Sequence, residues 1–481
     1  MRSKNMALAL LATAQFVVVL DASIVNVALP SIGRDLDFAQ DDLSWVVNAY
    51  TLFFGGFLLL GGRLADLLGR RRIFILGMWL FAIASLAGGL AQSDIWLVIA
   101  RAVQGLGAAL ISPAALAILT TTFAEGAERN KALAVWGAVA GSGGAVGVLA
   151  GGMLTEWAGW EWVLFVNTPI GIAAALLAPR IVDDSRDESN PSWDIAGAVT
   201  VTAGLSLLVY TLVDANSAGW GSAQTIGLGA LSLVLLASFV VIELRQRYPL
   251  IPFSIFRLRT LRGSNVIGLL LGMSLFAMFF FISLYMQQVL GYDPLKAGLA
   301  YLPLAGLIIV SAGGASQLVA RFGFKPVLIT GLLFTAAGLF WFSKVSAPGG
   351  SYVGDVLFPE MLAAVGLGLS FVPVTIGAVT GTKPNEAGLA SGLINTSQQV
   401  GGALGLAILS TIATSRTQDV FASGVHDPKI AYTEGFQDAF LAGGVIALAG
   451  ALLAFVLISS RDSREMAEKA REGASPAPIP A

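Results

Sequence analysis

The sequence predicts an all-α polytopic membrane protein, and three observations support this fold class. The chain has 481 residues, of which 56% are hydrophobic and only 12% are charged, whereas soluble domains carry about 25% charged residues. The mean hydropathy is +0.78, and a single soluble core stops growing beyond about 250–300 residues. The 56 glycines follow no collagen repeat, and they suit closely packed membrane helices.

Fourteen segments are long and apolar enough to be transmembrane helices, because a span needs about 20 mostly apolar residues. Their apolar runs are continuous, which excludes the alternating pattern of a membrane barrel. The first run is too long for a signal peptide and meets no small-residue cleavage site, so we expect it to remain as a span. The expected spans are approximately 6–29, 43–64, 73–91, 95–122, 131–156, 162–182, 194–213, 225–243, 264–289, 297–320, 325–344, 353–379, 387–413 and 437–460.

The placement of basic residues predicts the orientation. With alternating loops and a cytoplasmic start, most of the 28 lysine and arginine residues fall on the inner side, as the positive-inside rule requires. Removing one span would invert every later loop and destroy this asymmetry. We therefore expect N and C termini in the cytoplasm and a multi-pass protein of the cell membrane, the inner membrane of a bacterium.

Two similar stretches divide the chain into repeated parts. Residues 62–71 follow the second span and residues 316–325 follow the tenth, and three positions match at one fixed offset: Leu64 with Leu318, Gly69 with Gly323, and Arg71 with Lys325. Internal repeats of this kind are how transporters build alternating access around a central site.

This repeat predicts four regions. We expect an N-terminal six-helix bundle at 1–182, a linker plus two inserted transmembrane helices at 183–262, and a C-terminal six-helix bundle at 263–460. Residues 461–481 are charged and then rich in proline and alanine. They show no core-forming pattern, and we expect a disordered cytoplasmic tail there.

The composition excludes several classes of chemistry. Cysteine is absent and His426 is the single histidine, so zinc, iron–sulfur and haem sites and thiol catalysis lack ligands. There is no phosphate-binding P-loop motif. The 28 basic and 30 acidic residues give a net charge of −2, which offers no basic field for nucleic acid. We expect no metal, no cofactor and no enzymatic activity, and we interpret His426 as part of a solvated outer loop.

Several segments resemble the major facilitator superfamily. The inner loop Gly62–Arg72 resembles its loop signature, while the fourteen spans and Leu20–Pro30 resemble the drug:proton antiporter branch with fourteen transmembrane helices. Four further segments match this branch: Ala100–Ala109, Gly137–Gly152, Phe165–Gly171 and Glu386–Gly402. The resemblance covers nearly the whole chain and implies alternating access with proton coupling.

The chain departs from the family pattern at two positions. Val148 stands where the antiporter signature usually has proline after Gly147, and Glu161 stands between two tryptophans where the family usually has arginine. The first departure weakens the expected helix kink. The second exchanges a cation for an anion near the outer end of the sixth span.

Three ionisable residues lie inside expected spans: Asp21, Arg101 and Glu360. Charges there cost about 2.5–3.5 kcal/mol on insertion scales, so they indicate function. A carboxylate that alternates between apolar surroundings and an arginine can bind and release a proton. We expect these three residues to couple transport to protons. A static ion pair for Asp21 and Arg101, and a structural acid or a cation-recognition site for Glu360 beside Pro359, remain open alternatives.

Two further sets of residues have roles that rest largely on the resemblance. Asp66, Gly69, Arg70 and Arg71 form an expected gating latch on the inner face, the alternative being topology alone. The glycines of the fifth span align on one face and permit close helix packing, and the resemblance adds control of antiport. This antiporter glycine face consists of Gly143, Gly147, Gly151 and Gly152.

Polar and aromatic side chains in the spans are candidates for a substrate cavity, although helix–helix packing is the alternative for most of them. They are Asn26, Trp45, Tyr50, Gln104, Phe279, Tyr285, Asn395 and Gln398.

These observations together predict proton-coupled efflux of small amphipathic or cationic organic molecules, drugs or antibiotics among them. The expected partners are the small-molecule substrate, protons and the lipid bilayer, with no nucleic acid and a monomeric chain. A proton symporter or uniporter of a small nutrient is an alternative, which predicts more polar spans and no glycine face. A channel or a non-transporting membrane receptor is a third possibility, but it leaves the two halves and the three charges unexplained.

Overall fold

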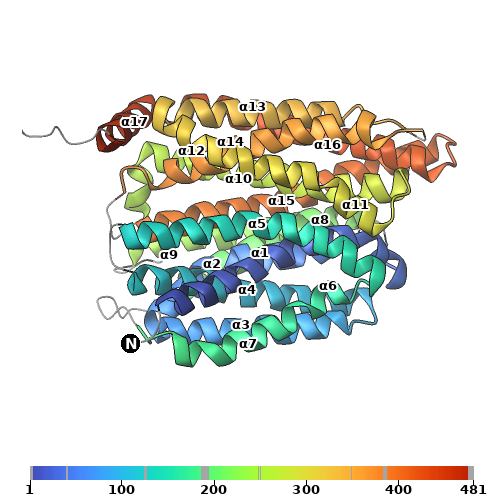
Figure 1. Cartoon of the computed structure of the whole chain (residues 1–481). Coiled ribbons are helices and arrows are strands. Elements are labelled where there is room, and N and C mark those ends of the chain that lie inside the picture. Colours follow the sequence, from blue (N-terminus) through green and yellow to red (C-terminus); the bar gives the residue numbers. More distant parts are fainter. Residues whose placement is uncertain are drawn as a thin grey trace, which may run out of the picture.

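The computed structural model describes residues 4–39, 42–123, 127–185, 194–246, 249, 251–347, 349–382 and 387–474. Within these ranges the chain is helical and contains no strand. The long helices run side by side along one direction (Figure 1). Eleven helical stretches of the described chain are long and apolar enough to cross a membrane. The expectation of an all-α polytopic protein is confirmed.

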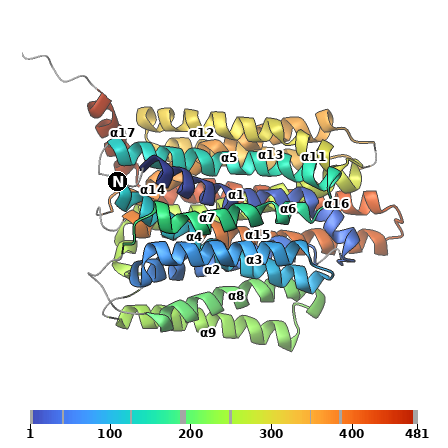
Figure 2. The same cartoon turned by 60° about the horizontal axis from the view of Figure 1, so that its bottom comes forward.

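The N-terminal part forms one bundle. Its helices are α1 (Lys4–Asp35), α2 (Trp45–Leu68), α3 (Arg70–Gly89), α4 (Asp94–Thr122), α5 (Ala127–Trp157), α6 (Trp162–Phe165) and α7 (Asn167–Ile181). The closest packing within this bundle joins α2 to α4, α1 to α5, α3 to α4 and α3 to α7. Figure 2 shows α2, α3, α4 and α7 lying alongside one another.

The C-terminal part repeats this arrangement. Its elements are α10 (Arg259–Leu284), the π-helical turn η2 (Tyr285–Val289), α11 (Pro294–Ala300), α12 (Leu302–Phe322), α13 (Phe324–Phe342), the π-helical turn η3 (Tyr352–Leu357), α14 (Phe358–Val379), α15 (Ala387–Ala422) and α16 (Pro428–Leu457). Here α12 packs on α14, α10 on α15, and α13 on both α14 and α16. The pairing matches that of the first bundle, so the weak sequence repeat reflects a structural one.

The turns that carry the repeated sequence adopt the same backbone conformation. Gly69, between α2 and α3, has φ of 108°, and Gly323, between α12 and α13, has φ of 84°. Residues with a Cβ avoid this region, which explains why glycine occupies both positions. We refer to the end of the bundle that carries these turns as the basic end.

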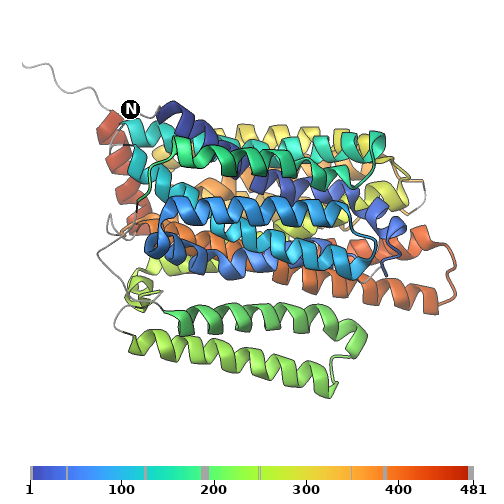
Figure 3. The same ribbon diagram turned by 90° about the horizontal axis from the view of Figure 1, so that it is seen from below.

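Two helices stand between the bundles in sequence and form a hairpin at the side of the molecule (Figure 3). They are α8 (Ile195–Ala218) and α9 (Ala223–Arg245), followed by the short 3₁₀ turn η1 (Phe253–Arg257). Helix α8 packs on α2 of one bundle and on α15 of the other. The Thr202 hydroxyl donates to the Gly56 carbonyl at 2.9 Å, and Val209 contacts Leu52 and Ala403. The hairpin therefore covers the seam between α2 and α15.

The C-terminal segment corrects one expectation. Residues 461–481 were expected to be disordered, but Ser460–Ala474 form helix α17, while residues 475–481 lie outside the described part. Alanine, glutamate, lysine and arginine are strong helix formers, and tertiary contacts hold this helix. The Ser463 hydroxyl accepts from the Lys325 backbone N–H at 3.0 Å, and Thr260 donates to Asp462. The expected linker is described up to Ser185 and again from Asp194.

Candidate functional site

A buried ion pair joins two helices of the N-terminal bundle. Asp21 on α1 has no exposed surface and Arg101 on α4 is 1% exposed, and an Arg101 Nη1–Asp21 Oδ2 distance of 2.6 Å links them. Arg101 also donates from Nε to the Val46 carbonyl at 3.0 Å. Its guanidinium carbon lies 4.4 Å from the centre of the Tyr50 ring. The structure therefore brings together two of the three charges expected inside spans.

Amides from two more positions complete the surroundings of Asp21. Its Oδ1 accepts from Gln104 Nε2 and from Asn167 Nδ2, both at 2.7 Å. Arg101 Nη1 donates to Gln104 Oε1 at 2.7 Å. The Ser85 hydroxyl accepts from both amides, at 3.0 and 3.2 Å, and donates to a backbone carbonyl. A buried ion pair persists when hydrogen bonds satisfy its remaining atoms, and this network connects α1, α3, α4 and α7.

Glycines on α4 allow this convergence. A Cβ on Gly105 would meet the Tyr50 carbonyl of α2, and a Cβ on Gly107 would meet the backbone of Phe81 on α3. The absence of these Cβ atoms lets α4 approach α2 and α3 closely, so that Arg101 reaches the Val46 carbonyl and Gln104 reaches the Ser85 hydroxyl.

Two members of the network were missing from the sequence candidates. Asn167 lies within Phe165–Gly171, a segment that resembles the family pattern. This motif is the sequence signal that indicates Asn167. Ser85 is a single serine in an apolar helix and carries no signal that distinguishes it from a packing residue.

Glu360 occupies a different environment in the C-terminal bundle. It lies in the first turn of α14 and has no exposed surface. Neither carboxylate oxygen has a hydrogen-bond partner among the described residues. The Leu304 backbone and the Tyr352 hydroxyl lie beside the carboxyl group, but Tyr352 donates its proton to the Ala300 carbonyl at 2.7 Å. Glu360 thus stands apart from the Asp21–Arg101 network.

The expected latch residues surround the α2–α3 turn at the basic end. Asp66 Oδ1 accepts from Arg70 Nη2 at 2.8 Å and from its Nε at 3.0 Å, across the turn at Gly69. Arg71 donates to the Val182 carbonyl at 3.2 Å, and its guanidinium lies 3.9 Å from Asp184. The turn therefore binds the chain that leaves α7.

Three of the four glycines expected on one face of α5 pack against α1. A Cβ on Gly143 would meet Val19, one on Gly147 would meet Ser23 and the Leu20 carbonyl, and one on Gly151 would meet the Ile24 carbonyl: Gly143, Gly147 and Gly151 thus follow consecutive turns of α1. Gly152 faces the other bundle, where a Cβ would meet Pro294 and Leu295 of α11. This stripe runs directly beside the helix that carries Asp21.

The cavity candidates do not line one common cavity. Gln104 and Tyr50 belong to the ion-pair network. Trp45 packs against Tyr210 of α8, with ring centres 5.9 Å apart and ring planes tilted by 39°. The backbone carbonyl of Asn26 accepts a hydrogen bond from the Ser283 hydroxyl of the other bundle at 2.8 Å. The Tyr285 hydroxyl donates to the backbone carbonyl of Ser346 at 2.9 Å.

The remaining candidates lie on α10 and α15. Asn395 is exposed and donates to the Ser391 carbonyl at 3.1 Å. Gln398 Nε2 is buried with no hydrogen-bond partner in the described part of the chain. Phe279 stacks on Tyr301, with ring centres 5.7 Å apart, and both rings line a small pocket between α5, α10 and α12.

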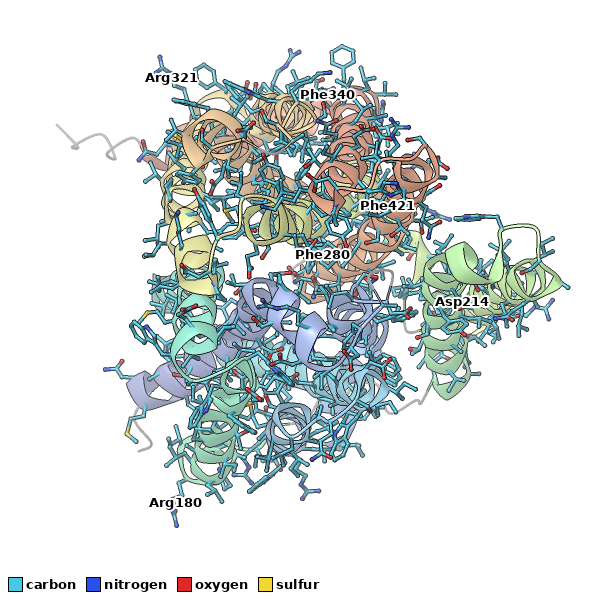
Figure 4. All side chains as sticks on the ribbon, turned by 90° about the vertical axis from the view of Figure 1, so that its right-hand side faces the viewer. Arg180, Asp214, Phe280, Arg321, Phe340 and Phe421 are labelled. Atoms are coloured by element: carbon cyan, nitrogen blue, oxygen red, sulfur yellow. The ribbon has the colours of Figure 1, made fainter. Side chains whose placement is uncertain are left out.

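A larger pocket, of about 200 Å³, lies between α10, α15 and α16. Phe280 of α10 and Phe421 of α15 line it, and both are labelled in the end-on view of Figure 4. Thr414 and Thr417 add hydroxyl groups to this aromatic wall. The same view shows the α8–α9 hairpin, marked by Asp214, at the side of the two bundles.

Comparison with known proteins places this geometry in context. The chain is 39% identical over 459 residues to the puromycin resistance protein pur8 of Streptomyces alboniger, covering 94% of this chain and 91% of that protein. It is 42% identical over 455 residues to the cephamycin export protein CmcT of Amycolatopsis lactamdurans, covering 94% and 92%. The multidrug resistance protein Stp of Mycobacterium tuberculosis is 33% identical over 399 residues, covering 82% and 73%.

Solved structures share the fold. A bacterial homolog of the human lysosomal transporter Spinster, in an inward-facing and unoccupied conformation, superposes with a TM-score of 0.69 at 16% identity, covering 96% of this chain and 98% of that one. The D-xylose–proton symporter gives a TM-score of 0.66 at 13% identity, covering 95% and 98%. The sequence profile of the Major Facilitator Superfamily matches residues 11–406. The chain is therefore a multi-pass membrane transporter that belongs to the Major Facilitator Superfamily.

Proposed function

We propose that the protein exports small amphipathic or cationic organic molecules across the cell membrane in exchange for protons, by alternating access. The relatives are resistance and export proteins for antibiotics and drugs, which supports the direction and the substrate class. The observation that carries the proton coupling is the fully buried Asp21–Arg101 pair, where four helices of one bundle meet.

Because of this ion pair, movement of α4 relative to α1 depends on whether Asp21 carries a proton. Removing one partner of a buried ion pair costs about 3–5 kcal/mol, because the other charge is left uncompensated. If α4 moves relative to α1, Arg101 leaves Asp21. A proton on the carboxylate then removes the negative charge, while Gln104 and the Val46 carbonyl still accept from Arg101. Proton binding to Asp21 and separation from Arg101 therefore favour each other. Glu360 is the third coupling residue of this proposal.

The other residue sets have supporting roles in the proposal. The Asp66–Arg70 pair across Gly69, with Arg71 bound to the end of α7, acts as the gating latch of the inner face. The glycine stripe on α5 lets α5 and α1 slide past each other without side-chain interlock, and Gly152 extends this smooth contact to the second bundle. Val148 keeps the backbone N–H that the usual proline lacks, in keeping with the continuous helix α5.

The proposal includes fourteen spans. Helices α5, α8 and α15 have 31, 24 and 36 residues and lie alongside the eleven apolar stretches (Figures 1 and 3). With these three counted, and with α6–α7 and α11–α12 each forming one span, the chain crosses fourteen times. The basic end, which carries both repeated turns and α17, then faces the cytoplasm.

Transport into everted membrane vesicles tests the function. An acidic lumen should drive accumulation of members of a panel that contains ethidium, puromycin and chloramphenicol, and a protonophore should abolish it. Asp21→Asn combined with Arg101→Gln keeps the buried site neutral and is expected to lose the pH-driven accumulation. If the wild-type protein carries none of the panel in response to the pH gradient, or if the double variant keeps the response, the proposed mechanism is wrong.

A further inference from the structure

The pocket of about 200 Å³ between α10, α15 and α16 has no part in the proton coupling or the latch proposed above. Most of its wall comes from residues 410–421 in the last turns of α15 and from Tyr432 and Phe436 in the first turns of α16. Helix α16 ends at the basic end, where Lys325 donates to the Ile458 carbonyl at 2.8 Å. The pocket therefore lies toward the opposite end of the C-terminal bundle.

Aromatic rings form much of the pocket wall. The Phe281 and Phe436 rings have centres 5.7 Å apart, and Tyr432 stacks on Phe436 at 6.3 Å. Phe421 meets Tyr432 edge-on at 6.4 Å. Phe281 and Phe436 are each 2% exposed, whereas Phe421 is 38% exposed, so the inner wall is well packed and Phe421 lies near the surface. Aromatic pairs prefer stacked and edge-on arrangements with centres about 4.5–7 Å apart, and a ring that enters the pocket finds such neighbours.

One hydroxyl of the pocket wall has no hydrogen-bond partner. The buried Oγ of Ser410, which lines the pocket, makes no hydrogen bond within the described part of the chain. Other hydroxyls of α15 do, since Thr411 and Thr417 donate to the Ala407 and Ala413 carbonyls at 3.0 and 2.8 Å. A buried hydroxyl without a partner is costly, and an acceptor removes that cost. The pocket therefore favours a ligand that offers an acceptor oxygen to Ser410.

The pocket offers no counter-ion to a charged ligand. None of the described residues that line it carries a charge. Arg416, which precedes Thr417 in the chain, does not line the pocket and forms an ion pair with Glu434 at 2.6 Å. A charge that leaves water for apolar surroundings without a counter-ion loses much free energy of hydration. The wall therefore selects a neutral ligand.

The volume of the pocket limits the size of the ligand. An apolar cavity of about 150 Å³ binds benzene, and pockets for drug-sized ligands begin at about 300 Å³. At about 200 Å³, this pocket admits a molecule with one or two rings. A segment of an acyl chain would fit by volume, but it would leave the Ser410 hydroxyl without a partner and would not stack on the aromatic wall.

We propose that this pocket is an accessory binding site for small neutral aromatic molecules that carry an acceptor oxygen, of which an aryl ketone is the simplest kind. The rings pack among Phe281, Tyr432 and Phe436, and the oxygen accepts from the Ser410 hydroxyl. All three helices of the pocket belong to the C-terminal bundle, so rotation of one bundle against the other as rigid bodies leaves the pocket intact. A ligand bound there is retained rather than carried across the membrane. The inference goes beyond the proposed function and does not depend on it.

The absence of native cysteine allows binding to be measured at one introduced thiol. Thr414→Cys places a thiol in the pocket wall, and benzophenone, a neutral ketone with two rings, should slow its alkylation by N-ethylmaleimide in the purified protein. Diphenylmethane has a similar shape without the oxygen and should protect at about fivefold higher concentration, the effect of one hydrogen bond. Adding Ser410→Ala should remove this difference. Ser423→Cys, at the tip between α15 and α16, is the control and should react at the same rate with and without either compound.

The inference is wrong if benzophenone protects neither cysteine, or protects both alike. It is also wrong if diphenylmethane, decanol as a mimic of an acyl chain, or the cation phenyltrimethylammonium protects Thr414→Cys as well as benzophenone does. A preference for the ketone that survives Ser410→Ala contradicts the assigned hydrogen bond.

If Thr414→Cys does not fold, the wild-type protein decides. Irradiated benzophenone inserts into nearby C–H bonds, so the peptides of α10, α15 and α16 that line the pocket should be labelled, and labelling confined to other peptides contradicts the inference. These measurements involve no transport, so their outcome leaves the proposed function untouched.

Discussion

At the scale of single residues, the two buried carboxyl groups have the same chemistry but lie in different surroundings. Asp21 is surrounded by a guanidinium and two amides that all donate to it, while Glu360 has no donor aligned with either oxygen. The sequence indicates both positions, because a charge in an apolar run is conspicuous. It does not distinguish their surroundings, since the partners come from helices far away in the chain. Ser85 is an example, because its hydroxyl accepts hydrogen bonds from Gln104 and Asn167 of two other helices, and the sequence around Ser85 does not indicate this.

Stability measurements test the description of the ion pair. Asp21→Asn leaves the Arg101 charge buried without its anion, which should destabilise the protein by about 3–5 kcal/mol. Asp21→Asn with Arg101→Gln removes both charges and should recover most of that loss. Thermal unfolding of the purified protein in detergent checks this order. Equal melting temperatures for the single and the double variant would show that the two charges are not coupled in the folded protein.

At the scale of helices and turns, small residues determine how closely the elements approach. The spacing of the α5 glycines predicts one packed face, and three of them do face α1. Gly152 differs because α11 of the other bundle reaches that turn, which no local pattern reveals. The expectation of a disordered C-terminal segment failed for a related reason, since α17 depends on contacts of Ser463 and Asp462 with distant helices. Contacts between elements that are far apart in the chain cannot be predicted from a single sequence.

Two glycines of α5 offer a matched comparison. A Cβ on Gly147 would lie 2.8 Å from the Leu20 carbonyl and would also meet Ser23, whereas one on Gly144 meets nothing within 4 Å. Gly147→Ala should therefore destabilise the protein by about 1–3 kcal/mol through overpacking. Gly144→Ala should be neutral or slightly stabilising, because alanine favours the helix. Thermal unfolding of both variants checks the prediction, which fails if Gly147→Ala unfolds at or above the temperature of Gly144→Ala.

The proposed gating latch makes a kinetic prediction. The Asp66 side chain is 33% exposed, and ion pairs at such positions contribute about 0–1 kcal/mol to stability. Asp66→Asn should therefore leave the melting temperature and substrate binding nearly unchanged but slow turnover, because the pair lies at the basic end, away from the Asp21 network. Transport rate and ethidium affinity are the two measurements, with Asp214→Asn on α8 as the control. A parallel loss of affinity and rate would contradict the latch assignment.

At the scale of the whole molecule, the repeated bundles make up most of what the sequence could predict. The matched loop positions, the apolar runs and the basic loops all point to two six-helix bundles with an inserted pair. The repeat is weak in sequence because the two bundles keep the glycines at helix contacts and exchange most other side chains. The position of the inserted hairpin could not be predicted in this way, since its helices carry little beyond an apolar surface.

The absence of native cysteine makes the topology testable by labelling. Ser185 follows α7, and Ser423 lies at the tip between α15 and α16, so an odd number of spans separates them when the chain crosses fourteen times. Ser423→Cys should react with a membrane-impermeant maleimide in intact cells, and Ser185→Cys should react only in everted vesicles. Labelling of both positions from the same side would rule out fourteen spans with cytoplasmic termini.

The position of α8 gives the transporter two unequal flanks. On one flank α8 touches both α2 and α15, so the hairpin closes that side to the surrounding lipid. On the opposite flank α5 packs directly on α11 and α12, away from the α8–α9 hairpin (Figure 4). We expect cargo dissolved in the bilayer to approach the bundles from this flank, so that bulky replacements along α12 should hinder hydrophobic cargo while water-soluble cargo passes unaffected.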